Sequence, residues 1–336
     1  MLKKKSKPKK NNKQSVDVVC VGGITQDIFF YSDQLQEFDN PKKDPNCLRL
    51  LSAELGAKII GKKMIRSVGG GASNSAINFS NLGLKTAIIS VVGSDPFGLS
   101  AINYFSENNI DCSSVKVIKN KETALSFLLS NSVSGNHTVF AYDGAKEDLN
   151  ITVEDLKKHN PKWLYVTSLS DNWQKVFKNI KTFLESSDCK LVWNPGVTQL
   201  LAGKEVLQKY IELCDIFVLN RDEATGLVAE GKNISVNEIL EKVGELGANI
   251  NVMTDGPSGV YVTIGKQRFF EPALSNLKPI NTTGAGDAFS STLVASLHKG
   301  VSLQLAMRYA VRQSSNILKS IGAQTGLKKW NSLKNN

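Results

Sequence analysis

Near its beginning the chain reads Val16-Asp17-Val18-Val19-Cys20-Val21-Gly22-Gly23. This short apolar run, closed by two glycines, predicts a buried strand and a tight turn. Similar apolar runs follow and alternate with helical patterns of about ten residues. The predicted strands are 86–92, 163–167, 190–193, 216–219 and 251–254, and the predicted helices are 72–82, 98–108, 174–185, 205–213, 236–246, 287–298 and 302–319. This alternation is typical of βαβ units, so we predict a three-layer α/β/α fold with a central, mostly parallel sheet.

Two stretches, residues 28–66 and 113–142, interrupt this alternation and are rich in strand-forming residues. In the second stretch, residues 123–129 and 137–142 flank a glycine-containing turn, which predicts a hairpin. We expect the two stretches to form a small β-sheet lid beside the main domain, which spans residues 16–330. Residues 331–336 are expected to form a C-terminal tail.

Most of the positive charge lies at the N-terminus. The chain of 336 residues carries a net charge of +10, which falls to +3 without the seven lysines before Ser15. Residues 1–15 contain almost no apolar side chains, so we expect them to be disordered. A solvated tail without a function is the simpler interpretation, and contact with nucleic acid or another acidic surface is the alternative. For the remainder of the chain we expect no nucleic-acid partner.

Composition favours a cytoplasmic location. No apolar run reaches the roughly 18 to 20 residues that a membrane span needs, and the lysine-rich start lacks the apolar segment of a secretory signal. The five cysteines are widely spaced without a C-x-x-C pair, and the three histidines are far apart. These spacings disfavour a disulfide framework and a His-ligated metal site. We therefore expect a reducing compartment, the cytoplasm, and no membrane partner.

The stretch with the clearest chemistry is Thr282-Thr283-Gly284-Ala285-Gly286-Asp287-Ala288-Phe289. Its small residues Gly284, Ala285 and Gly286 permit a close approach between backbone and ligand. They precede an apolar helix, so their N–H groups are first-turn donors that can bind a phosphate or a developing anion. Asp287 lies beside this anion site and can accept a proton as a general base. A plain strand–helix turn capped by Asp287 is the alternative interpretation of these residues alone.

A second glycine cluster, Gly69-Gly70-Gly71, also precedes a predicted helix. Asn74 lies in the first turn of that helix and offers a carboxamide that can bind a hydroxyl group. Asp27 follows the end of the first strand, where ligands of open α/β sheets bind. Its carboxylate can accept hydrogen bonds from two neighbouring hydroxyls, although a role in a turn is the alternative.

Asn220 and Glu223 follow another predicted strand and are three residues apart. They share a face if a helix begins there. Their oxygen atoms suit hydrated Mg²⁺, which keeps most of its waters when it binds to proteins. We interpret the intervening Arg221 and Asp222 as solvated charges.

Taken together, these motifs resemble the ribokinase-like (pfkB) family of carbohydrate and nucleoside kinases. The stretch from Gly69 through Asn74 to Gly83 resembles the family's N-terminal motif, and Thr282–Phe289 resembles its C-terminal motif. The resemblance spans about residues 16–327, with all motifs in order. The other stretches that carry it are Asn220–Glu223 (an N-x-x-E motif), Thr254–Gly259 (a nucleotide-side glycine turn) and Gly322–Gln324 (the end of a cation loop).

The resemblance implies an ATP-dependent kinase that uses Mg²⁺. It implies that Asp287 deprotonates the acceptor hydroxyl, while the backbone of Gly284, Ala285 and Gly286 holds the transferring charge. The remaining residues are assigned to substrate (Asp27, Gly70, Gly71 and Asn74), to Mg²⁺ through water and to phosphates (Asn220 and Glu223), and to ATP (Thr254, Gly256 and Gly259). The lid would exclude water from the reaction. The resemblance also implies a homodimer formed through the lid.

One position departs from the family pattern. The family has Asp where this chain has Asn281, which with Thr283 and Gly322 belongs to the site of an activating monovalent cation such as K⁺. Asn281 keeps an oxygen ligand but lacks the charge. The resemblance therefore leaves activation by K⁺ open.

We predict a small sugar such as ribose or fructose as the acceptor. A nucleoside such as adenosine is the first alternative, because the segment before Gly69 is long and Phe29, Phe30 and Tyr31 can stack on a base. The same aromatic residues are also expected to form the core of the lid. A non-catalytic sensor of a sugar or nucleotide is the second alternative, and the general base Asp287 argues against it.

Overall fold

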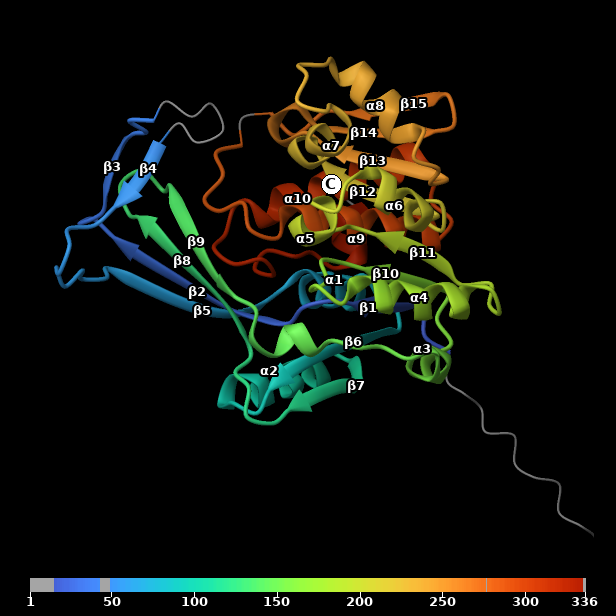
Figure 1. Cartoon of the computed structure of the whole chain (residues 1–336), viewed down its shortest axis with the longest axis horizontal. Helices are drawn as coiled ribbons and strands as arrows, with labels where there is room; N and C mark the ends of the chain where they lie inside the picture. The colour runs from blue at the N-terminus through green and yellow to red at the C-terminus, as the bar shows by residue number, and fades with distance from the viewer. Residues whose placement is uncertain (1–14, 43–48, 276, 335–336) are drawn as a thin grey trace, which may run out of the picture.

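A long twisted sheet with helices on both faces forms the body of the molecule (Figure 1). The structure is a computed structural model that describes residues 15–42, 49–275 and 277–334. Within these residues the sheet has nine strands, in the order β15 (Gln267–Glu271), β14 (Val260–Ile264), β13 (Ile250–Thr254), β12 (Ile216–Asn220), β11 (Lys190–Trp193), β10 (Trp163–Val166), β1 (Val18–Val21), β6 (Thr86–Gly93) and β7 (Ile110–Ile118). Neighbouring strands from β13 to β7 pair in parallel, while β13, β14 and β15 pair antiparallel. The predicted α/β/α fold with a mostly parallel sheet is confirmed.

Helices cover both faces of this sheet because its strands are apolar on both faces. In β1, Val19 and Val21 pack into one core, while Val18 and Cys20 pack into the other, as expected for a strand buried on two sides. The first core is covered by α3 (Val153–His159), α4 (Trp173–Leu184), α5 (Val197–Leu200), α6 (Lys204–Ile211), α7 (Arg221–Val228) and α8 (Val236–Gly244). The second is covered by α1 (Gly71–Asn81), α2 (Pro96–Glu107), α9 (Ala285–His298), α10 (Leu303–Ile317) and α11 (Trp330–Lys334). In the described part of the chain, none of these helices combines the length and apolar character that crossing a membrane requires.

A small sheet projects from one side of the body (Figure 1). Its strands, in order, are β5 (Lys63–Gly69), β2 (Thr25–Ser32), β8 (Ala124–Asn131) and β9 (His137–Tyr142), and β3 (Gln36–Asp39) pairs separately with β4 (Arg49–Ser52). The predicted hairpin is confirmed, since β8 and β9 pair antiparallel. Phe29 is fully buried, and the ring of Phe30 lies 5.9 Å from that of Phe127. These two aromatic residues therefore belong to the packing of the small sheet.

The predicted lid boundaries need correction. Residues 113–118 belong to β7, which pairs with β6 at the edge of the main sheet, and not to the small sheet. The polar residues Ser113, Ser114 and Lys116 hide the apolar pattern of this strand. The small sheet also extends beyond the predicted segment 28–66, because β2 begins at Thr25 and β5 ends at Gly69.

The C-terminal end of the described chain packs against the body. The prediction that residues 331–336 form a tail is wrong for residues 331–334. These residues are helical, and Leu333 is buried against the second core. In the same helix the ring of Trp330 lies 5.7 Å from that of Tyr309, nearly perpendicular to it. Residues 1–14 of the predicted disordered tail lie outside the described residues.

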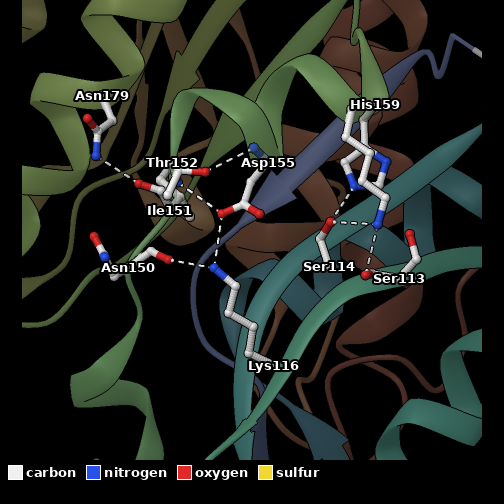
Figure 2. A network of polar contacts seen from close by, with 10 residues as sticks. Ser113, Ser114, Lys116, Asn150, Ile151, Thr152, Asp155, His159 and Asn179 are labelled. Carbon is white, nitrogen blue, oxygen red and sulfur yellow. Dashed lines mark hydrogen bonds and ion pairs between the residues drawn. The ribbon is translucent and has the colours of Figure 1, made fainter. Parts of the chain in front are cut away.

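A network of polar contacts fixes the edge strand β7 to α3 (Figure 2). His159 is buried, with its Nε2 2.8 Å from Ser114 Oγ and its Nδ1 3.3 Å from Asp111 Oδ2. Lys116 Nζ donates to Asp155 Oδ2 at 3.0 Å. Burial lowers the pKa of His159 from its ordinary value of 6.5, although the charge of Asp111 opposes this. The folded protein therefore favours the neutral imidazole.

The lowered pKa gives the fold a testable pH dependence. A neutral buried histidine contributes its full stability above pH 6.5, and that contribution is lost as the pH falls through the lowered pKa. In urea titrations between pH 7.5 and pH 5.5, the free energy of unfolding of the wild type should fall more than that of His159→Gln. The control is His137→Gln, at an exposed position, which should keep the wild-type pH dependence. Equal slopes for wild type and His159→Gln would contradict the assignment.

Candidate active site

The candidate site lies at the carboxyl ends of the parallel strands. The strand order reverses at β1, which has β6 on one side and β10 on the other, and ligands of open α/β sheets bind at such a point. A cavity of about 190 Å³ opens at this edge. Its lining comes from the ends of β11, β12 and β13 and from the start of α9, and consists of Asn194, Val218, Leu219, Asn220, Glu223, Thr254, Gly284, Gly286 and Asp287.

Asp287 lies in the first turn of α9, which begins at Ala285 and not at Asp287 as predicted. The N-cap Gly284 has a φ of 80°, a left-handed conformation that favours glycine. A Cβ at this position would overlap Ala323. Gly284 is therefore required both by its backbone conformation and by the close approach of the chain around Ala323.

The predicted anion site at the start of α9 has fewer free N–H donors than expected. The N–H of Ala285 donates to Thr282 O at 3.2 Å, so this predicted donor is engaged within the protein. In the described residues the N–H groups of Gly286 and Asp287 have no protein acceptor. Nothing lies within 4 Å of a Cβ placed on Gly286. Two first-turn N–H groups, at Gly286 and Asp287, can therefore face an anion.

Two of the predicted polar residues, Asn74 and Asp27, interact with Asp287. Asn74 Nδ2 donates to Asp287 Oδ2 at 2.8 Å. Burial raises the pKa of Asp287 to about 6, and the hydrogen bond from Asn74 opposes this rise. Burial, and then the charge of Asp287, raises the pKa of Asp27 to about 7, while a hydrogen bond from Ser126 opposes it. The site thus holds two carboxyl groups whose pKa values are raised toward neutral pH.

The glycines before α1 bring chain segments into contact around Asp27. A Cβ on Gly69 would overlap the carboxylate of Asp27, and a Cβ on Gly70 would overlap the carbonyl of Gly23. A Cβ on Gly71 would lie 3.0 Å from that of Thr167. These glycines have a packing role that the sequence-based interpretation, which assigned them to ligand contact, did not include.

Asn220 and Glu223 form a capping box at the start of α7. Asn220 Oδ1 accepts from Glu223 N and Glu223 Oε2 accepts from Asn220 N, both at 2.8 Å. Burial raises the pKa of Glu223, and the hydrogen bond from Asn220 N opposes this. Both residues line the 190 Å³ cavity together with Asp287. Their oxygen atoms suit hydrated Mg²⁺, which needs only one or two carboxylates from the protein.

Arg221 was predicted to be a solvated charge, and its side chain is 44% exposed, but it also forms an ion pair that was not predicted. Its Nη1 donates to Asp255 Oδ2 at 3.1 Å, and the Asp255 side chain is only 12% exposed. Asp255 belongs to the turn after β13, where its N–H donates to Gly259 O at 2.8 Å. The ion pair therefore fixes the start of α7 to the predicted nucleotide-side turn.

A second cavity of about 450 Å³ lies beside the first. The predicted residues Thr254, Gly256 and Gly259 line it together with apolar side chains. The apolar part of its lining includes Val260, Leu274, Phe289, Val311 and Leu318. Thr254 and Gly286 line both cavities, so the two spaces adjoin at the first turn of α9.

Among the predicted cation-site residues, the described structure joins Asn281 and Thr283 by a hydrogen bond but does not join Gly322 to either of them. Asn281 is buried, and its Oδ1 accepts a hydrogen bond from Thr283 N at 2.9 Å. Gly322 has a φ of 99°, and a Cβ there would lie 3.8 Å from Ser67 Oγ in β5. Among the described residues, no hydrogen bond joins Gly322 to Asn281 or Thr283.

Sequence reasoning missed two contacts that hold the polar centre. Ser126 hydrogen bonds to Asp27, and Gln324 Nε2 donates to Asn74 Oδ1 at 3.0 Å. Ser126 lies opposite Asp27 in the β2–β8 register, so its role follows only from strand pairing. Gln324 was identified as the end of a motif, without a partner.

Comparison with known proteins identifies related chains. Residues 17–330 match the family described as pfkB family carbohydrate kinase. The chain is 25% identical over 316 residues to the ATP-dependent 6-phosphofructokinase of Thermoanaerobacterium thermosaccharolyticum, covering 88% of this chain and 94% of that protein. It is 23% identical over 277 residues to the ribokinase of Bacillus subtilis, covering 81% and 88%.

Solved structures share the fold. The nucleoside kinase of Methanocaldococcus jannaschii has a TM-score of 0.72 at 20% identity, and the match covers 96% of this chain and 97% of that one. The ribokinase of Arabidopsis thaliana complexed with ribose and ATP has a TM-score of 0.77 at 17% identity, covering 96% and 98%. Both similarities support the three-layer architecture.

The turn before α9 provides a matched pair of glycine variants. Gly284→Ala should lower the free energy of unfolding by about 2 kcal/mol or more, because it adds a left-handed backbone penalty and an overlap. Gly286→Ala should change stability little, since its Cβ meets open space and its φ is not left-handed. Urea denaturation of both variants measures the difference. Equal stability of the two variants would contradict the described turn.

Proposed function

Since the chain belongs to the pfkB family of carbohydrate kinases, we propose that it transfers the γ-phosphoryl group of ATP to a hydroxyl group of a small sugar. The family and the ribokinase relatives make it an ATP-dependent carbohydrate kinase. The observation that carries the proposal at this site is Asp287. This half-buried carboxylate has its pKa raised to about 6 and stands where a cavity, two free N–H groups and the polar side chains of Asp27 and Asn74 meet.

In the proposed reaction Asp287 accepts the proton of the acceptor hydroxyl as that oxygen bonds to the γ-phosphorus. The bond from phosphorus to the ADP oxygen breaks, and ADP leaves with the electron pair. The N–H groups of Gly286 and Asp287 stabilise the negative charge on the transferring group. Asp27 and Asn74 hold neighbouring hydroxyls of the acceptor, and the small sheet acts as a lid that excludes water.

The two cavities suggest how the donor binds. We propose that the 450 Å³ cavity, with Thr254, Gly256 and Gly259, takes the nucleoside part of ATP. The phosphates then extend toward Gly286, where the cavities adjoin. Asn220 and Glu223 would hold Mg²⁺ through water, and the ion would neutralise phosphate charge. Activation by K⁺ is not part of the proposal, because Asn281 is uncharged and its oxygen is engaged by Thr283.

A nucleoside is the second candidate acceptor. Phe29 and Phe30 pack within the small sheet, which argues against base stacking by these residues. A cavity of about 590 Å³ between Arg49, His137 and residues 279–282 nevertheless leaves room for an acceptor larger than a monosaccharide. The similarity to an archaeal nucleoside kinase agrees with this candidate.

An ADP-release assay against a panel of acceptors tests the function. The panel contains ribose, fructose, fructose 6-phosphate, adenosine and inosine. With the best acceptor, Asp287→Asn should lower kcat by about 10² to 10⁴. For the wild type, kcat/KM should fall as the pH drops through about 6, because the base must be ionised.

The matched control is Asp188→Asn, which lies before β11 at the opposite end of the strands and should keep wild-type turnover. Absence of turnover with every acceptor would refute the kinase proposal and favour the sensor alternative. Near-wild-type turnover by Asp287→Asn would remove Asp287 from its role.

We further propose that two copies associate through the outer face of the small sheet. Phe30, Phe127 and Phe140 form a row on this face, with ring separations of 5.9 and 6.5 Å. Phe140 is 57% exposed, and the neighbouring Met64 and Tyr142 are 53% and 54% exposed. An exposed apolar patch of this kind is typical of an interaction surface.

Sedimentation equilibrium tests the homodimer. The wild type should show twice the chain mass of 36.6 kDa, and Phe140→Asp should shift it to the monomer with unchanged circular dichroism. The control Leu201→Asp alters an exposed apolar residue of the main domain and should remain dimeric. A monomeric wild type at tens of micromolar would refute this part of the proposal.

We also propose a cytoplasmic location. The cysteines of the described residues, Cys20, Cys112, Cys189 and Cys214, are free thiols, which suits a reducing compartment. Recovery of the protein outside the cytosolic fraction of cells would refute it.

A further inference from the structure

A chain of hydrogen bonds runs from α2 to the carboxylate of Asp287. Tyr104 OH donates to Gln324 Oε1 at 2.8 Å. Gln324 Nε2 donates to Asn74 Oδ1 at 3.0 Å, and Asn74 Nδ2 donates to Asp287 Oδ2 at 2.8 Å. The four residues are separated by up to 250 positions along the chain, yet every bond points its donor toward Asp287.

Each carboxamide in this chain has only one useful orientation. A carboxamide presents an acceptor at one end and a donor at the other. Gln324 Nε2 also faces Val68 O at 2.9 Å and Ser73 Oγ at 3.1 Å. A flip would point Gln324 Oε1 at the carbonyl of Val68, which can only accept a hydrogen bond. The surroundings therefore hold Gln324 with its amino group toward Asn74.

The orientation of Asn74 follows from that of Gln324. With Oδ1 occupied by the Gln324 donor, Nδ2 is the end that faces Asp287. If Asn74 flipped, its Oδ1 would face the Asp287 carboxylate and its Nδ2 would meet the donor of Gln324. Asn74 is 5% exposed, so solvent offers little compensation for either mismatch.

We propose that Gln324 and Tyr104 are positioning residues that orient the Asn74 carboxamide and, through it, the carboxylate of Asp287. This inference rests on the proposed function of Asp287 as the general base. The hydrogen bond from Asn74 favours the ionised carboxylate, the form that can accept a proton. Because it engages Oδ2, it also fixes which oxygen is directed at the acceptor.

The titratable side chains around Asp287 do not supply this stabilisation. The titratable side chains that interact with it electrostatically are Asp27 of β2, Cys20 of β1 and Tyr165 of β10, and all three are acids. A negative charge on any of them opposes ionisation of Asp287. Asn74, held by Gln324, is the contact that lowers the pKa of Asp287 against the effect of burial.

The chain contains a matched control for this inference. Gln313 is a fully buried glutamine whose Nε2 donates to Asn78 Oδ1 at 2.8 Å. Asn78 lies one turn after Asn74 on α1, but its amide bonds to Ser291, Thr292 and Ala288 instead of Asp287. Gln324→Met and Gln313→Met remove equivalent donors with little change in volume, and Tyr104→Phe removes only a hydroxyl.

The first readout does not need activity. In the full-length protein without substrate, the Asp287 carboxyl carbon is titrated by NMR and assigned by its loss in Asp287→Asn. We expect its midpoint to rise by about 1 unit in Gln324→Met and by a smaller amount in Tyr104→Phe. It should stay at the wild-type value in Gln313→Met. An unchanged midpoint in Tyr104→Phe and in Gln324→Met would overturn the inference.

The second readout uses the ADP-release assay. In Gln324→Met, kcat should fall about tenfold and the acidic limb of kcat/KM should move upward with the NMR midpoint, while KM for ATP stays constant. Gln313→Met should lower stability without moving the limb. A kcat loss without a shift of the limb would indicate a merely structural role and overturn the inference. If the wild type turns over no acceptor, the proposed function fails, and the NMR titration still decides the role of Gln324.

Discussion

Helices α1 and α9 begin side by side, and the site depends on how closely they pack. Both start at a glycine N-cap with positive φ, Gly70 and Gly284. Their contact is lined by small buried side chains and by Asn78, whose amide reaches Ser291 and Thr292 at 2.8 Å each. This short separation lets the Asn74 amide meet Asp287 although the two residues are 213 positions apart in the sequence. A bulkier contact would move these two polar groups out of reach of each other.

This arrangement places a buried acid, Asp27, near a half-buried one, Asp287. The pKa values of Asp27 and Asp287 rise to about 7 and 6 from the ordinary value of 3.8. The folded state therefore binds protons more tightly than the unfolded state at these positions, so the two groups lower stability as the pH rises from about 4 to 7. The packing of the surrounding helices and sheet offsets this cost. Because its pKa is raised, Asp287 can take up and release a proton near neutral pH.

Much of the architecture and part of the site could be predicted from the sequence. The alternation of apolar runs and helical patterns is a local signal, and it predicts the parallel sheet. Asp287, Asn74, Asp27, Asn220 and Glu223 could be selected because each follows a strand or opens a helix, and the carboxyl ends of parallel strands share one edge. The structure brings these residues to that edge.

Most of the missed features depend on partners that are distant in sequence, and one depends on the closure of a local turn. The strand β7 has a polar sequence because Ser114 bonds to the buried His159 of α3 and Lys116 donates to Asp155 of the same helix. The N–H of Ala285 is engaged because the turn closes on Thr282. The pairing of Arg221 with Asp255 and of Gln324 with Asn74 joins segments 34 and 250 residues apart. No local pattern contains this information.

The small sheet is attached to the body along one line. Thr25, Gly69 and Ala124 lie in register where β2, β5 and β8 meet the main domain, and β9 returns to it at Tyr142, opposite Leu125. The opposite ends of the four strands, around Ser32 and Asn131, reach away from the body (Figure 1). The sheet is therefore attached to the body at one end and projects freely at the other. Asp27 stands two residues from the fixed end, so a swing of the whole sheet carries its tip far while it moves this carboxylate little. This attachment separates two proposed tasks within one element, because the free end of the sheet is far from the carboxylate that is proposed to bind substrate.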